Sequence, residues 1–128
     1  MAHVMSASEQ ALVESWRALA DRHARVTCAL ERVLQDEHGL GVSEFEVMER
    51  LAAPDKDQHR MQDLADAVYL SQSALSRLIG RLESDGLVTR AICSDDRRGI
   101  FACLTDHGRA RYEAAKPSQR RVLADSLG

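Results

Sequence analysis

Five polar side chains lie together in the middle of the chain, and their types match those that recognise nucleic acid. They are Gln72, Ser73, Ser76, Arg77 and Arg81. Hydroxyl, amide and guanidinium groups near the start of a helix can reach base edges and phosphates when the helix enters the major groove by its N-terminus. The same residue types are common on solvated helix faces, so this pattern alone leaves both interpretations open.

Residues that would support catalysis or metal binding are scattered instead. The five histidines include no His-x-x-x-His pair, the three cysteines include no Cys-x-x-Cys pair, and no glycine-rich phosphate loop or nucleophile elbow occurs. We therefore expect no enzyme, no metal site and no cofactor. The odd number of cysteines, Cys28, Cys93 and Cys103, predicts free thiols.

Length and composition indicate one folded domain over residues 1–128, with 45% hydrophobic residues. No apolar run approaches the roughly 20 residues of a membrane span, and the start lacks the build of a signal peptide, which predicts a soluble cytoplasmic protein. Basic and acidic residues number 6 and 11 over 1–58, 6 and 6 over 59–100, and 5 and 3 over 101–128. The resulting charges of −5, 0 and +2 neither predict nor exclude DNA binding.

The first predicted helix covers residues 8–36. Its apolar positions recur at spacings of four and three, with His23 in the one gap: Leu12, Trp16, Leu19, Val26, Leu30 and Val33. This narrow seam suits packing along a helix of a second chain, or burial within one domain. Gly39 and Gly41 end the segment, and Ser43 with Glu46 forms a capping-box pattern for a second helix that stops near Pro54.

Two short helices sharing one small core are predicted between residues 60 and 86. The first buries Leu64, Ala65 and Val68, and a tight turn passes through Tyr69 and Leu70. Ser71 caps the second helix, whose inner face is formed by Leu75, Leu78, Ile79 and Leu82. The five polar side chains lie off that face. Two short helices joined by a tight turn predict a helix-turn-helix.

A charged hairpin follows. Residues 87–92 and 99–104 read as two strands, and the polar loop between them carries Arg97 and Arg98 at its tip. Both arginines are placed to touch the DNA backbone or to enter a narrow minor groove, and Asp96 can hold Arg98 in position. Thr105 and Gly108 then open a last helix that runs past Tyr112 to Pro117 and the Arg120–Arg121 pair.

In these parts the sequence resembles the MarR family of transcriptional regulators over about residues 10–123. The resemblance rests on short motifs in family order: Asp63-Leu64-Ala65, residues 73–78, Leu82-Glu83, Gly86-Leu87-Val88, Arg90, Asp96-Arg97-Arg98, and Leu104-Thr105 with Gly108. It implies a mainly α (α+β) fold: a winged helix-turn-helix at 43–104 with a two-stranded wing supported by Arg90 and Asp96. Dimerisation helices at 8–36 and 105–128 would flank it.

The resemblance also implies function. We expect a homodimer that binds a pseudo-palindromic operator in double-stranded DNA, as a ligand-responsive repressor. Family members usually continue past Leu127–Gly128 into a further helix, so we expect either a truncated chain or a first helix that carries more of the interface. The alternatives are a winged helix used only for protein interaction and a cysteine-based redox sensor, although Cys28 is expected to be buried.

A small aromatic or anionic effector is also expected, bound where the dimerisation helices meet the winged lobe. Trp16 and His23 lie seven residues apart on the seam of the first helix and offer an aromatic surface and a polar tip. The competing interpretation is structural: Trp16 would fill a core and His23 would form a hydrogen bond across a dimer.

Overall fold

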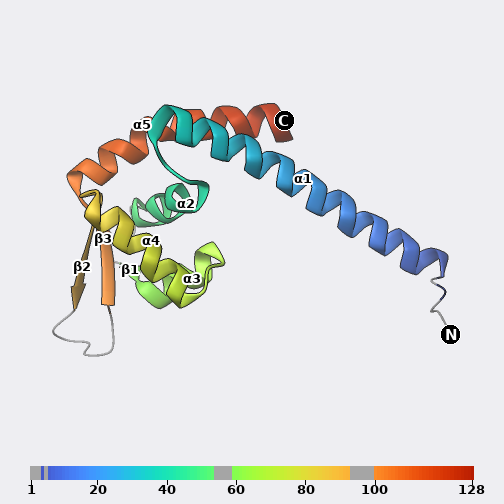
Figure 1. The fold of residues 1–128 in the computed structure, drawn as a ribbon, viewed down its shortest axis with the longest axis horizontal. Coiled ribbons are helices and arrows are strands. Elements are labelled where there is room, and N and C mark those ends of the chain that lie inside the picture. The colour runs from blue at the N-terminus through green and yellow to red at the C-terminus, as the bar shows by residue number, and fades with distance from the viewer. Residues whose placement is uncertain (1–3, 5, 54–58, 93–99) are drawn as a thin grey trace.

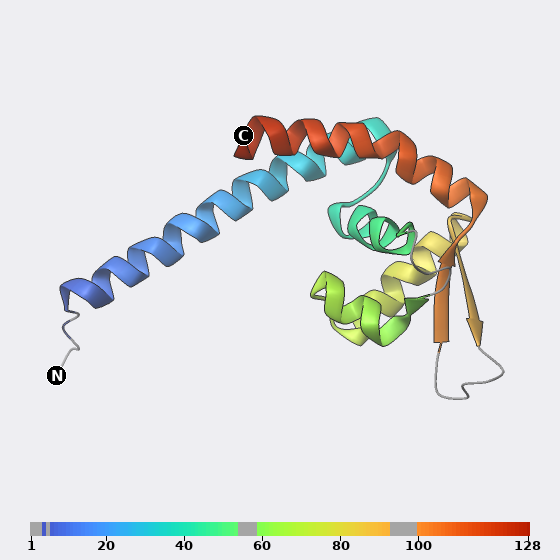
Figure 2. The ribbon, with the colours of Figure 1, turned by 180° about the vertical axis from the view of Figure 1, so that it is seen from behind.

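The computed structural model describes residues 4, 6–53, 59–92 and 100–128. Two long helices, α1 (Ala7–His38) and α5 (Asp106–Leu127), form one layer, and a lobe of three short helices with a small sheet hangs beneath one end of it (Figures 1 and 2). The N-terminal part of α1 projects well beyond the lobe. This mainly helical arrangement with a small antiparallel sheet is the predicted fold class.

Helix α1 has a defined cap at each end. The Ser6 hydroxyl accepts a hydrogen bond from the backbone N–H of Glu9, and the Glu9 carboxylate accepts one from the N–H of Ser6, which completes a capping box. Gly39, with φ of 65°, ends the helix and donates its N–H to the Gln35 carbonyl. The predicted glycine stop is therefore confirmed.

Helix α2 (Val42–Leu51) begins earlier than the sequence pattern suggested. Gly41 is its N-cap, and the Glu44 carboxylate accepts the Gly41 N–H at 2.9 Å. The expected cap at Ser43 with Glu46 is wrong, because Ser43 already lies inside the helix. A carboxylate three residues after the cap serves this end, but the register is shifted back by two residues.

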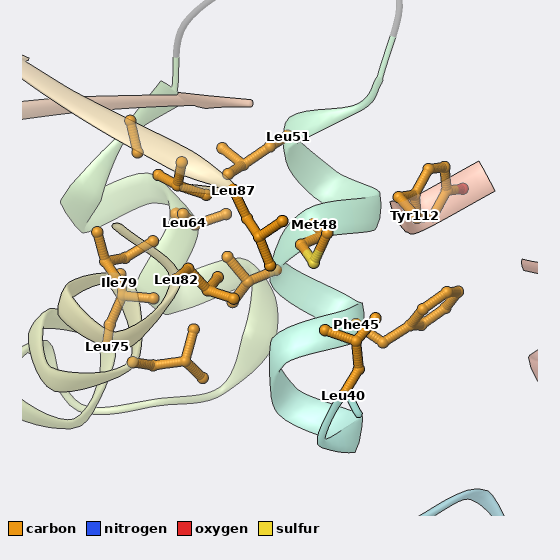
Figure 3. Close-up of a cluster of buried hydrophobic side chains, with 14 of the residues drawn as sticks. Leu40, Phe45, Met48, Leu51, Leu64, Leu75, Ile79, Leu82, Leu87 and Tyr112 are labelled. Atoms are coloured by element: carbon orange, nitrogen blue, oxygen red, sulfur yellow. The ribbon is translucent and has the colours of Figure 1, made fainter. Parts of the chain in front are cut away.

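Helices α3 (Met61–Val68) and α4 (Gln72–Ser84) form the predicted helix-turn-helix. Ser71 caps α4, since its hydroxyl accepts the Ala74 N–H at 3.2 Å. The inner side of α4 packs against α2 and α3 in one apolar core (Figure 3). The predicted inner residues are all buried there: Leu75, Leu78, Ile79 and Leu82.

The sheet has the strand order β1-β3-β2 and is antiparallel. Strands β2 (Val88–Ile92) and β3 (Ile100–Leu104) form the predicted hairpin, with Val88 opposite Leu104 and Arg90 opposite Ala102. A third strand, β1 (His59–Arg60), was not predicted and pairs with the other edge of β3. The two-stranded wing is thus joined to the lobe through β3.

The start of α5 is fixed against the start of β2 by a close backbone approach. Thr105 caps α5 by accepting the Gly108 N–H at 2.9 Å, and its hydroxyl donates to the Gly86 carbonyl at 2.7 Å. The Thr105 N–H donates to the Leu87 carbonyl at 3.0 Å. A Cβ on Gly108 would lie only 2.0 Å from that carbonyl oxygen, so only glycine fits. These contacts couple α5 to the wing.

Among the described residues, no helix combines the length and the apolar character that crossing a bilayer requires.

Substituting Gly108 tests this coupling. We expect Gly108→Ala to lower the free energy of unfolding by about 1–3 kcal/mol, because the methyl group must push α5 away from β2. Gly80→Ala is the matched control, since its Cβ would lie 3.4 Å from Arg90 Nη2 and the helix propensity of alanine should leave stability unchanged or raised. Equal urea midpoints for the Gly108 variant and the wild type would contradict the close approach.

Candidate nucleic-acid interface

The outward side of α4 carries the polar side chains singled out in the sequence. All five are exposed: Gln72, Ser73, Ser76, Arg77 and Arg81. The start of α4 and the outer ends of β2 and β3 both lie on the side of the lobe away from the α1–α5 layer (Figures 1 and 2). Helix and hairpin therefore share one end of the molecule.

Two guanidinium groups on α4 have no partner among the residues that the structure describes. Neither the Arg77 nor the Arg81 side chain forms a hydrogen bond or an ion pair there, whereas Arg90, Arg120 and Arg121 are each paired with a glutamate. An unpaired arginine keeps all its donors available for a ligand with anionic oxygens.

An open cleft of about 910 Å³ runs from these arginines to the junction of α1 and α2. Its opposite wall is acidic, and two of its carboxylates are already engaged by backbone N–H groups: Glu31 accepts from Val42, and Glu44 accepts from Gly41. The cleft is lined by Glu31, Gln35, Gly39, Gly41, Val42, Ser43, Glu44, Arg77, Gly80, Arg81, Ser84 and Asp85. The two arginines of the cleft therefore lie on α4, and Glu31 and Glu44 lie on the opposite wall.

Arg90 joins the wing to the helix. Its Nε donates to Glu83 Oε1 at 3.2 Å, and its Nη2 donates to the Ser76 carbonyl at 3.3 Å. Gly80 lies one turn from Ser76, and a Cβ at that position would be 3.4 Å from this guanidinium, an ordinary van der Waals contact. Sequence reasoning assigned Arg90 to the wing but missed Glu83 and Gly80, because their proximity depends on how β2 crosses α4.

The tip of the wing lies outside the described residues. Asp96, Arg97 and Arg98 all fall in the segment 93–99, as does Cys93. Their expected contacts with the DNA backbone stay predictions.

The N-terminal part of α1 presents an apolar stripe to solvent. Leu12, Trp16 and Leu19 are 70%, 67% and 64% exposed, while Leu30 farther along the same seam is buried. His23 is exposed as well, and neither it nor Trp16 lines the cleft. The expectation of a buried Cys28 is wrong within this chain, because Cys28 is exposed. The seam is thus buried only where α5 and the lobe lie against it.

A partly exposed polar cluster beside the core holds α5 to α2. The Tyr112 hydroxyl donates to Glu49 Oε1 at 3.1 Å, and Arg120 donates to the same carboxylate oxygen. Burial, together with the hydrogen bond to Glu49, raises the pKa of Tyr112. Burial also raises the pKa of Glu46, and neighbouring Glu49 adds to that effect. Tyr112 and Arg120 are both bound to Glu49, so these contacts hold α5 against α2.

A helix-turn-helix with a hairpin wing joined to the second helix defines the winged-helix class of proteins. A model of the MarR family matches residues 42–100 of this chain. Two solved structures from Streptomyces coelicolor superpose with a TM-score of 0.86 each. AbsC, a MarR family transcriptional regulator, is 33% identical, and the match covers 98% of this chain and 82% of AbsC.

The second structure is Sco3205, a MarR family transcriptional regulator in complex with DNA. It is 28% identical, with 99% of this chain and 78% of that chain covered. The Escherichia coli homoprotocatechuate degradative operon repressor is 31% identical over 86 residues, which is 66% of this chain and 56% of the repressor. The chain spans about half the length of the curated relatives it matches.

Because AbsC is 33% identical to this chain and the match covers 82% of AbsC, this chain belongs to the MarR family of transcriptional regulators.

Proposed function

We propose that this chain is a sequence-specific, double-stranded DNA-binding transcriptional repressor that acts as a homodimer. The outward face of α4 carries the proposal: Arg77 and Arg81 are exposed and unpaired among the described residues, beside the hydroxyls of Ser73 and Ser76. Such groups read base edges in the major groove. The relative Sco3205 supports this interpretation, because its structure was solved with DNA.

The proposed docking follows from the arrangement of the lobe. Helix α4 enters the major groove by its N-terminus, so that Gln72, Ser73, Ser76 and Arg77 meet base edges and Arg81 reaches a phosphate. Arg90 keeps the wing at a constant distance from α4 through Glu83 and the Ser76 carbonyl. Arg98, with Arg97 as its substitute and Asp96 holding it, then follows the backbone beside the groove.

The homodimer is supported by the stripe on α1. Leu12, Trp16 and Leu19 lie at spacings of four and three on the part of α1 that projects beyond the lobe (Figure 1). Exposed large apolar side chains in one stripe favour a partner surface, and a two-fold pair of identical chains buries such a stripe on itself. Two winged lobes then face two half-sites, which is the reason to expect a pseudo-palindromic operator.

Two arginine variants test the docking. Arg77→Ala should lower discrimination between a selected operator and random duplex by about 1–3 kcal/mol, since a base contact is lost. Arg98→Ala should weaken binding to both duplexes with a smaller loss of specificity, because it removes a backbone contact. Arg109→Ala, an exposed arginine on α5, controls for the loss of one charge and should bind like the wild type.

The measurement is the affinity of each variant for the operator and for random duplex at the same salt concentration. If Arg77→Ala and Arg98→Ala both bind the operator as the wild type does, the proposed docking is wrong.

We further propose that a small aromatic acid releases the DNA by binding at Trp16 and His23, which a second copy would cover in the dimer. The E. coli relative supports this class, since its name links it to the degradation of homoprotocatechuate, an aromatic acid. Because Leu12 and Leu19 remain to hold the dimer, Trp16→Ala and His23→Ala should keep operator affinity within a few fold but blunt release by salicylate. Ser15→Ala, on the same exposed helix, is the control. Loss of the dimer in either variant would show that the residues are structural.

A further inference from the structure

The turn between α3 and α4 contains a residue whose conformation and exposure both need an explanation. Tyr69 has φ of 59°, and it is the one non-glycine residue with a positive φ among the residues that the structure describes. Its side chain is 94% exposed. A bulky residue in the left-handed region is unusual, because its Cβ crowds the following carbonyl oxygen.

The backbone at this position has to be left-handed. The N–H groups of Tyr69 and Leu70 both donate to the Ala65 carbonyl, the second at 3.0 Å, and this ends α3. Val68 and Leu70, on either side, pack against the core. The fold therefore requires a left-handed residue between them, and glycine would supply that conformation without steric cost.

The tyrosine side chain contributes almost nothing to the stability of the fold. At 94% exposure it buries almost no apolar surface, and it forms no hydrogen bond with any described residue. Residues held in such sparsely populated backbone conformations cluster at functional sites.

DNA is the surface that the position favours. Tyr69 lies two residues before Ser71, the cap of the helix that enters the groove in the proposed docking. Phenolic hydroxyls are among the groups that hold phosphates at the edges of a protein–DNA interface. We propose that the Tyr69 hydroxyl donates a hydrogen bond to a DNA phosphate beside the major groove entered by α4. This contact rests on the proposed function and adds a residue to it.

Removing the hydroxyl tests the contact directly. Tyr69→Phe should raise the Kd for the selected operator by about 10-fold or more, the size of one hydrogen bond to a charged acceptor. A neutral phenol releases no counterion, so the slope of log K against log salt should equal that of the wild type. Arg98→Ala should instead reduce that slope by about 1.

Tyr112→Phe is the matched control, because it deletes the hydroxyl that bonds to Glu49 in the core. It should lower the Tm and leave operator affinity within twofold. Tyr69→Gly should do the reverse: it should bind as weakly as Tyr69→Phe or more weakly, while its Tm is equal to or a few degrees above that of the wild type. A lowered Tm would show that the fold does use this side chain, and would overturn the proposal.

The remaining outcomes separate this contact from the docking on which it rests. If Tyr69→Phe binds within twofold of the wild type while Arg77→Ala loses discrimination, the docking stands and the Tyr69 contact is refuted. If Arg77→Ala also binds normally, the proposed function fails first. If light scattering shows that Tyr69→Gly has lost a dimer which the wild type forms, the tyrosine contacts a second copy and the DNA contact is overturned.

Discussion

Burial of four apolar side chains on one side of α4 is the constraint on which the rest of the structure depends. Each of Leu75, Leu78, Ile79 and Leu82 contributes about 1.5–3 kcal/mol when fully buried. The partly exposed ion pair between Arg90 and Glu83 contributes at most about 1 kcal/mol. The core therefore sets the rotation of α4 about its axis, and the arginine bridge only keeps the wing beside it.

That rotation decides which groups can meet a ligand. With the apolar side facing α2 and α3 (Figure 3), Ser73 and Arg77 have to point outward, and Ser76 turns its carbonyl toward Arg90. The close contact between Gly108 and the Leu87 carbonyl then transmits the position of this lobe to α5. In the proposed dimer, a change in how the two chains pair along α1 and α5 would therefore move both α4 helices as rigid parts.

Sequence patterns predicted the elements whose signals are local. Helical periodicity and the Ser71 cap located α4, and the left-handed Gly39 ended α1 as expected. Features that depend on distant pairing were missed: β1 has only two residues and exists because β3 lies beside it. Ser43 is not the cap, because the N-cap of that helix is Gly41, whose N–H donates to the Glu44 carboxylate. Cys28 was expected to be buried because it lies well inside the first helix, between Val26 and Leu30, yet only part of α1 has a partner in its own chain.

In the proposed complex, two outward α4 faces, held together by α1 and α5, read two copies of a half-site. The most direct measurement is the mass of the complex formed with an operator selected from random duplex, by multi-angle light scattering at micromolar protein. We expect two chains per duplex and half-sites about 10 base pairs apart, centre to centre, on one face of the DNA. One chain per duplex, bound to a site without two-fold symmetry, would contradict it.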